Sequence, residues 1–377
     1  MSSPRGAVRS RRSAISVAVV GAQGPAGRAI LRELVGAAAR GGAGEPGGAR
    51  IGTVLAIDSE PVEVGGTQWR QADPGDPSLA AVLQGVDTAI YVATRTDLDK
   101  ELAEGRPARR QRNLRRAQTV ITSAAAAGVG HLIVVTSAKV FGARPDNPVP
   151  LDDEAPLRAV VDTGTVGDLI DVEQLAAVAR EVHPGLQVTV VRPAALVGDG
   201  VDTVITRHFE APRLLTVKGA EPTWQFCHVD DLGSAIAVIA SHRLGPALTV
   251  ACDGWLTQDE VERITGMRRV ELSLAVAQGT ADRLHRVGLL PTPSSDLAFV
   301  VHPWAVASGT LRAHGWEPAY DNATCLGVLL DGIRGSHAVA ARRLDRKDAA
   351  LGAASAAVAM VGTAAIMRRK RRKGGGA

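Results

Sequence analysis

Aromatic residues and cysteines are both scarce in this chain of 377 residues. Phe, Trp and Tyr make up 3% of the sequence, a composition bias that carries no functional meaning. The three cysteines, Cys227, Cys252 and Cys325, are widely spaced and odd in number. This pattern predicts neither a disulfide framework nor a zinc site, so a reducing cytosol is the simplest location. No His, Asp or Glu cluster has metal-ligand spacing, and no metal is expected.

A basic face is also missing from the body of the chain. The net charge of +4 comes from the two ends, because residues 1–13 hold four arginines and no acid and residues 368–373 are all basic. The remaining residues carry a net charge of about −6, which argues against nucleic-acid binding. Basic ends are typical of solvated tails, and attraction to anionic lipid is the alternative.

The tail, residues 342–377, contains an uncharged, alanine-rich stretch from 349 to 367. Its length just suffices to cross a bilayer, but alanine gives a weak drive to insert and the basic flank opposes the positive-inside tendency. Membrane contact through 349–373, as a spanning anchor or a surface helix, and a solvated helix all stay open. The apolar run 15–20 is too short for a signal peptide. We therefore expect a cytoplasmic protein, free or held at the inner face of the membrane by this tail.

Apolar, β-branched runs alternate with helical stretches through the first half of the chain. This alternation predicts an α/β fold with a doubly wound parallel sheet covered on both faces. Beyond residue 192 it breaks down into short elements, typical of a smaller lobe. The strands are expected at 15–20, 53–57, 88–93, 131–136 and 187–192, and the helices at 28–39, 77–83, 107–127 and 168–182.

A glycine-rich turn joins the first predicted strand to the first predicted helix. Gly21 permits the tight turn, Gly24 lets the backbone approach a diphosphate, and Gly27 allows the helix to pack closely on the strand. The free N–H groups of the helix N-terminus favour an anion there. The turn therefore predicts a Rossmann dinucleotide site, whose expected contact residues are Gly21, Gln23, Gly24, Pro25, Ala26 and Gly27.

Two acidic residues follow at the positions expected for the adenosine end of the nucleotide. Asp58 closes the second strand and is placed to accept hydrogen bonds from ribose hydroxyls; as a carboxylate it repels a 2′-phosphate, so NAD is favoured over NADP. Capping of a turn is its alternative role. Asp73 either meets the adenine amino group or starts a turn.

Six further stretches resemble signatures of the extended short-chain dehydrogenase/reductases, the NAD-dependent epimerase/dehydratase group that contains UDP-glucose 4-epimerase. The resemblance spans residues 14–335 and implies that Ala93, Asn113 and Arg192 lie at the cofactor. It divides the chain into a basic, disordered arm (1–13), an NAD(P)-binding Rossmann domain (14–192), a substrate lobe interleaved with it (193–335) and the tail. The stretches are 85–93, 113–129, 136–142, 192–198, 226–232 and 311–318.

The catalytic pair of that family is missing. Its enzymes use a tyrosine, and a lysine four residues later, to exchange a proton with the substrate hydroxyl. Alignment on Glu173 places Thr165 at the tyrosine position and Leu169 at the lysine position. Neither Tyr91 nor Tyr320 has a lysine four residues on, so a shifted alignment does not restore the pair.

Four other residues are candidates for chemistry. Ser137 matches the family serine but needs an activating base. Lys139 follows two residues later and would point to the same side as Ser137 on an extended segment. It is either a substitute base or a surface lysine. His228 and Asp230 form either a catalytic pair or, as the resemblance favours, a structural corner.

Two functions therefore stay open. The first is an NAD(P)-binding epimerase/dehydratase-like enzyme that acts on a small molecule, such as a nucleotide-sugar, by transient hydride transfer. The second is a non-catalytic NAD(P)-binding sensor or scaffold that uses the tail to reach the membrane. A homodimer is compatible with both.

Overall fold

The computed structural model describes residues 14–40, 48–161, 164–286 and 294–343. The predicted basic arm and nearly all of the alanine-rich tail lie outside these ranges. Within them, no helix combines the length and the apolar character that crossing a membrane requires.

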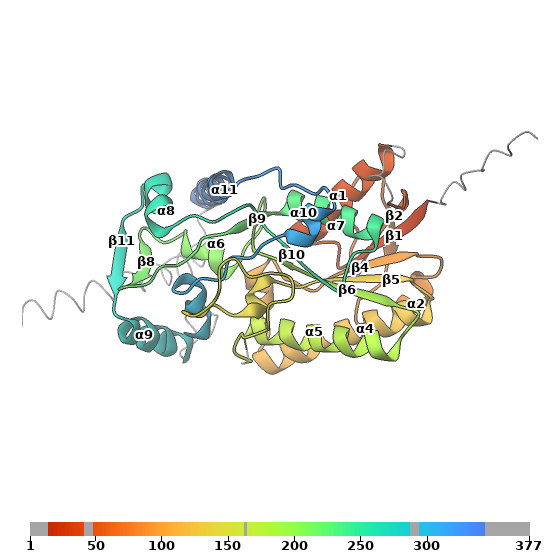
Figure 1. Ribbon diagram of the computed structural model, residues 1–377, viewed down its shortest axis with the longest axis horizontal. Coiled ribbons are helices and arrows are strands. Elements are labelled where there is room, and N and C mark those ends of the chain that lie inside the picture. Colours follow the sequence, from red (N-terminus) through yellow and green to blue (C-terminus); the bar gives the residue numbers. More distant parts are fainter. Residues whose placement is uncertain (1–13, 41–47, 162–163, 287–293, 344–377) are drawn as a thin grey trace, which may run out of the picture.

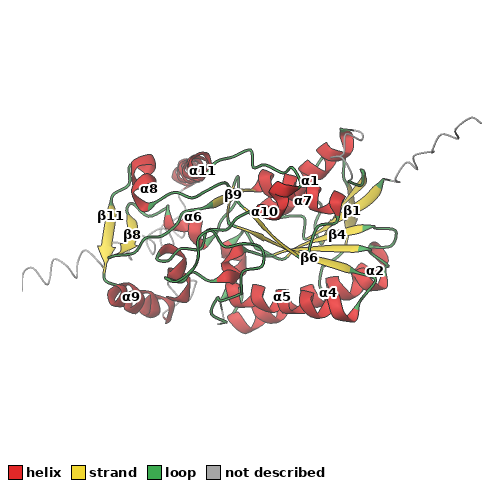
Figure 2. Cartoon of the chain, in the orientation of Figure 1, coloured by secondary structure: helices red, strands yellow, loops and turns green. Residues whose placement is uncertain are grey.

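A seven-stranded parallel sheet forms the centre of the larger part of the molecule (Figure 2). Its strand order is β10-β6-β5-β4-β1-β2-β3, so the order reverses between β1 and β4. Ligands of open parallel sheets bind outside the carboxyl ends of the strands at such a reversal. The strands are β1 (Ile15–Val20), β2 (Ile51–Asp58), β3 (Gln68–Gln71), β4 (Thr88–Val92), β5 (His131–Val135), β6 (Gln187–Pro193) and β10 (Ala247–Val250).

Helices cover both faces of this sheet. Helices α4 (Arg106–Ala126) and α5 (Thr165–Val182) lie on one face, and α1 (Pro25–Ala39) and α7 (Val229–His242) lie on the other (Figure 1). Successive residues of β1 therefore enter two different cores: Val17 and Val19 face one, and Ala18 and Val20 the other. Burial on both faces explains why this strand is continuously apolar.

A smaller lobe follows β6 and holds two short parallel sheets, in which β7 (Ala195–Val197) pairs with β9 (Phe226–His228) and β8 (Leu214–Val217) with β11 (Arg269–Leu272). The chain returns to the large sheet for α7 and β10, so residues beyond 193 complete it. The remaining helices are α2 (Leu79–Val82), α3 (Leu98–Leu102), η1 (Ala138–Phe141), α6 (Val204–His208), α8 (Gln258–Thr265), α9 (Leu274–Arg286), η2 (Ser294–Val300), α10 (Gly309–Ala313) and α11 (Asn322–Arg343).

The predicted α/β parallel architecture is confirmed, and its five strands each differ from the observed ones by two residues or fewer at either end. Strands β3 and β10 were not predicted. All four residues of β3 are exposed, and its polar sequence Gln-Trp-Arg-Gln gives no apolar run to detect. The sequence of β10 is apolar but lies in a region whose elements no longer alternate.

The close approach of α1 to the preceding turn depends on Gly27. A Cβ at this position would lie 2.7 Å from the Cα and the carbonyl oxygen of Ala22. Both contacts involve backbone, which has no side-chain rotation to relieve them, so the helix would have to move.

We expect Gly27→Ala to lower the free energy of unfolding by about 2 kcal/mol, as overpacking of a rigid contact does. Gly279→Ala is the matched control, because its Cβ would meet no atom within 4 Å in a helix interior. There alanine is expected to stabilise by about 0.5 kcal/mol. Urea unfolding of both variants measures the difference, and equal stability of the two would contradict the packing role of Gly27.

Candidate functional site

The turn between β1 and α1 has the geometry of an anion cradle. Gly21 has a φ of +80°, which an L side chain rarely adopts. Gly24 is the N-cap residue of α1, and no side chain caps this helix end, while Pro25 occupies its first turn. A Cβ on Gly24 would lie 3.6 Å from the hydroxyl of Thr96, on the side of the turn that faces the carboxyl ends of the strands. The open N–H groups and the small residues fit a diphosphate.

Asp58 lies against this turn. Its Oδ2 accepts a hydrogen bond from the backbone N–H of Gln23 (3.0 Å), and its Oδ1 accepts one from the N–H of Ser59 (2.8 Å). The carboxylate thus fixes the turn, which is the capping role considered from sequence, and its contact with a ribose stays a prediction. Asp73 caps a turn through the N–H of Gly75 and pairs with Arg116 at 3.2 Å.

Arg28, near the start of α1, contacts the glycine turn and was not singled out by the sequence pattern. Its Nε donates to the carbonyl oxygen of Gln23 (2.9 Å), and its guanidinium also bonds the side chain of that glutamine. This folds a cation back over the start of α1, where it can neutralise a bound anion. An arginine early in a helix gives no sequence signal that its side chain will bond back to the preceding turn.

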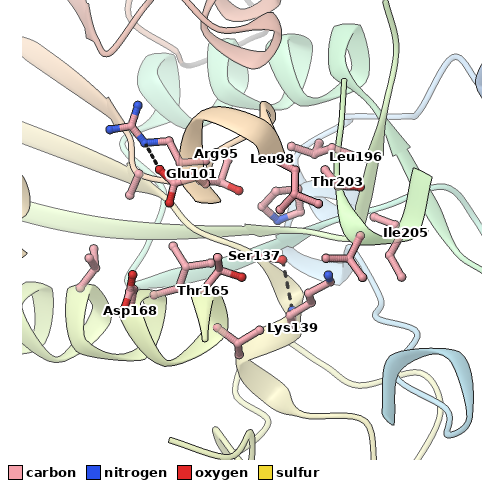
Figure 3. Close-up of a pocket in the computed structure, with 18 of the residues that line it drawn as sticks. Arg95, Leu98, Glu101, Ser137, Lys139, Thr165, Asp168, Leu196, Thr203 and Ile205 are labelled. Carbon is pink, nitrogen blue, oxygen red and sulfur yellow. Dashed lines mark hydrogen bonds and ion pairs between the residues drawn. The ribbon is translucent and has the colours of Figure 1, made fainter. Parts of the chain in front are cut away.

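A cleft opens at the carboxyl ends of β4, β5 and β6 (Figure 3). The first turn of α5 forms one wall, and the loop that leads into α6 forms another. This places sequence segments from residues 91 to 205 around one space. Six of its lining residues were already named as site positions from the sequence: Ala93, Asn113, Ser137, Lys139, Thr165 and Leu169. Further lining residues are Arg95, Glu101, Asp168, Asp202 and Thr203.

Ser137 is the N-cap residue of η1. The sequence predicted an extended backbone after it, and this prediction is wrong because residues 138–141 form a 3₁₀ helix. The Oγ of Ser137 accepts a hydrogen bond from the N–H of Lys139 (3.3 Å). A hydroxyl that accepts in this way keeps its own proton for a second oxygen. Both side chains still line the cleft, since the first turn of η1 carries Lys139 to the same side as Ser137.

Thr165 and Leu169 lie one turn apart at the start of α5, and both line the cleft. Figure 3 shows the hydroxyl of Thr165 on the same side of the cleft as that of Ser137. Neither of the two tyrosines takes the place of the missing catalytic tyrosine. Tyr91 reaches the cleft wall from β4 but is buried in the core, which raises its pKa, and Tyr320 stacks on His228 with ring centroids 3.8 Å apart.

A buried ion pair supports the same end of α5. The Oδ2 of Asp168 accepts hydrogen bonds from Arg109 Nε (3.0 Å) and from Asn113 Nδ2 (3.0 Å), and both charged side chains are 3% exposed. The other oxygen, Oδ1, is buried and has no hydrogen-bond partner among the described residues. Arg109 precedes Asp168 by 59 positions, so no local pattern predicted this pair.

The side chains of Arg192 and His228 both make polar contacts within the protein. The guanidinium of Arg192 makes a bidentate ion pair with Glu173, at 2.7 Å for the shortest contact, and lies outside the lining of the cleft. The Nδ1 of His228 accepts the N–H of Asp230 at the start of α7, while Asp230 pairs with Arg32. A cofactor contact of Arg192 thus stays a prediction, and His228 has the contacts of a structural corner.

Among the ranges that the structure describes, no three His, Cys, Asp or Glu side chains come together in a way that would hold a metal ion. The polar side chains that line the cleft carry hydroxyl, ammonium, guanidinium, amide and carboxylate groups.

A sequence model of the NAD(P)H-binding family matches residues 21–214, which is half of the chain. The chain belongs to this family. Among curated proteins it is similar to the uncharacterized protein Rv0501 of Mycobacterium tuberculosis, with 23% identity over 54% of each sequence. The uncharacterized protein y4nG of Sinorhizobium fredii is 24% identical over 65% of this chain and 62% of that protein. The chain thus spans a little more than half the length of these relatives.

The fold is that of nucleotide-sugar dehydratases and epimerases. A dTDP-glucose 4,6-dehydratase from Streptomyces venezuelae, solved with NAD bound, superposes with a TM-score of 0.62 at 17% identity over 86% of this chain and 98% of that one. A UDP-glucose-4-epimerase from Stenotrophomonas maltophila, solved with NAD and a formylated UDP-arabinopyranose, gives 0.61 at 18% identity over 86% and 99%. The resemblance read from the sequence motifs is confirmed at the level of family and fold.

We expect Asp168→Asn to lower the free energy of unfolding by about 3–5 kcal/mol, because it leaves the buried Arg109 without its counter-charge. Asp171→Asn is the matched control on the same helix: it breaks the pair with Arg110, whose side chain is 35% exposed, and is expected to cost about 1 kcal/mol or less. Thermal and urea unfolding of both variants measure the contrast. Similar losses would mean that the Arg109 pair is not the stronger support.

Proposed function

We propose that this chain binds NAD in preference to NADP and uses the cleft for hydride transfer on a hydroxyl-bearing small molecule of the nucleotide-sugar class. The observation that carries the proposal is the meeting of Ser137, Lys139 and Thr165 in one cleft, at the edge of the parallel sheet where the turn between β1 and α1 also lies. The substrate class comes from the shared fold with UDP-glucose 4-epimerases that were solved with a formylated UDP-arabinopyranose and with UDP-glucose.

The cradle supplies the contacts that a dinucleotide needs. The N–H groups at the start of α1 and the guanidinium of Arg28 would hold the diphosphate, and Asp58, which lies against the same turn, would accept hydrogen bonds from the adenosine ribose. When bound, the nicotinamide accepts or returns a hydride. For the nicotinamide end of the dinucleotide, Oδ1 of Asp168 is a buried acceptor on the cleft wall. A ribose hydroxyl that donates a hydrogen bond to this oxygen would satisfy it. This contact would stand where the lysine of related enzymes is replaced by Leu169.

The substrate oxygen is assigned to the hydroxyls of Ser137 and Thr165. Ser137 accepts from the backbone and so can donate to that oxygen, and Thr165 presents a second hydroxyl from the start of α5. Neither hydroxyl takes up a proton at neutral pH without a base. A separate proton acceptor is therefore required for turnover.

The second candidate is a cofactor-binding sensor without turnover. It is favoured by the replacement of both members of the usual pair, since Leu169 brings neither charge nor a hydrogen-bond donor to the cleft. Both candidates share the nucleotide site and differ only in what happens in the cleft.

The choice between NAD and NADP tests the role of Asp58. We expect Asp58→Asn to weaken NAD binding and to strengthen NADP binding, so that the preference for NAD falls about tenfold or more, because the repulsion of a 2′-phosphate is lost. Asparagine keeps an oxygen for the N–H of Gln23, which preserves the turn. Asp73→Asn is the control and should leave the ratio unchanged. Calorimetric titration with both nucleotides measures it, and an unaltered ratio in Asp58→Asn would remove the basis for the NAD preference.

Turnover separates the two candidate functions. The purified protein with NAD is incubated with a panel of UDP- and dTDP-sugars, and products are resolved by chromatography while NADH absorbance is followed. We expect Ser137→Ala to reduce turnover by about 10²–10³, the loss typical of one positioned donor, with NAD affinity unchanged. Ser78→Ala, outside the cleft, should be without effect. NAD bound with no turnover on any sugar would favour the sensor, and the absence of nucleotide binding would overturn both candidates.

A further inference from the structure

Lys139 points into the cleft rather than to bulk solvent. In Figure 3 its side chain extends from η1 past Ser137 toward Ile205, and its nitrogen lies within the cleft. Arg95 is the other cationic residue lining the described cleft, but its guanidinium pairs with Glu101 at 3.5 Å. Lys139 is thus an amine held close to the two hydroxyls assigned to the substrate oxygen.

The surroundings of this amine come from η2, far along the chain. The Nζ of Lys139 lies over the ring of Phe299, 5.2 Å from its centroid, and the buried carboxylate of Asp296 lies near enough to interact with its charge. Burial lowers the pKa of Lys139, and Asp296 opposes this by raising it, with burial the larger effect. Asp296 and Phe299 also line a second pocket, together with Gly142 and Ala143, which follow η1.

We propose that Lys139 is the proton acceptor that replaces the missing tyrosine, with Asp296 as a positioning residue that holds its side chain toward the cleft. This inference rests on the proposed function. Geometry carries it, because the amine lines the same cleft as Ser137 and Thr165 and lies over the ring of Phe299.

The step balances with the groups named. The substrate carbon gives its hydride to the bound cofactor, and the hydroxyl on that carbon gives its proton to the neutral amine. The O–H bond breaks, an N–H bond forms, and the C–O bond becomes a carbonyl. Lys139 ends as an ammonium that can return the proton when the hydride returns, so no further reactant is consumed in an isomerisation.

The other charges around the cleft are already paired. Asp168 is neutralised by Arg109, and Asp202 pairs with Arg207 at 2.5 Å. Together with the Arg95–Glu101 pair, they leave Asp296 as the carboxylate that acts directly on Lys139.

Site-resolved acetylation tests this assignment without any substrate. The full chain, with and without saturating NAD, is treated with a trace of acetic anhydride from pH 6 to 11, and the acetylation of each lysine is followed by mass spectrometry. We expect Lys139 to reach half-maximal reactivity at least one pH unit below Lys100 and Lys218, which are exposed. A midpoint equal to or above theirs, or no acetylation of Lys139 at any pH, would overturn the proposal.

Variants at Asp296 test the positioning role. Asp296→Asn removes the negative charge that raises the pKa of the amine, so the acetylation midpoint of Lys139 should shift further down. Asp282→Asn, exposed on α9, is the control and should leave it unchanged. An unshifted midpoint in Asp296→Asn would exclude the contact.

Turnover variants distinguish failure of this inference from failure of the proposed function. Lys139→Met keeps an apolar chain against Phe299 and should retain NAD affinity and melting temperature while losing turnover at least 100-fold. If Ser137→Ala abolishes turnover and Lys139→Met does not, the proposed function stands and the Lys139 assignment fails. If the protein binds no nucleotide, the proposed function fails, and the inference falls with it.

Discussion

The contact between Gly27 and the backbone of Ala22 decides where the first helix begins and what it can bind. Because a Cβ would come within 2.7 Å of that backbone, glycine lets α1 start directly against the end of β1. The uncapped N–H groups at the helix start then point to the carboxyl edge of the sheet, beside Asp58 and Thr96. Any residue that displaced the helix would move all of these donors together.

The parallel sheet explains how distant segments form one cleft. Each strand ends at the same edge, so the residues that follow β4, β5 and β6 meet there although long helices separate them in sequence. The start of α5 is brought to the same place by the buried pair of Asp168 and Arg109. Its first turn thus lines the same cleft as Ser137.

Sequence patterns were sufficient for the elements that have local causes. The glycine turn, the apolar strands and Asp58 all follow from steric or burial rules that act within a few residues. The sequence left Lys139 as either a substitute base or a surface lysine on an extended backbone, but Ser137 caps a 3₁₀ turn that the composition of Ala-Lys-Val-Phe does not indicate. The contact of Lys139 with Phe299 and its charge interaction with Asp296 arise from tertiary packing over more than 150 positions, for which a single sequence holds no periodic signal.

Completion of the nucleotide-binding half requires chain that is made much later. Gly233 of α7 packs so closely on α1 that a Cβ there would lie 2.9 Å from the carbonyl oxygen of Ala29, and β10 closes the edge of the sheet beside β6. During synthesis, the face of α1 that packs on α7 therefore stays uncovered until residues 229–242 have been made. A ligand that binds the finished turn would then stabilise a chain that already includes α7 rather than an early fragment.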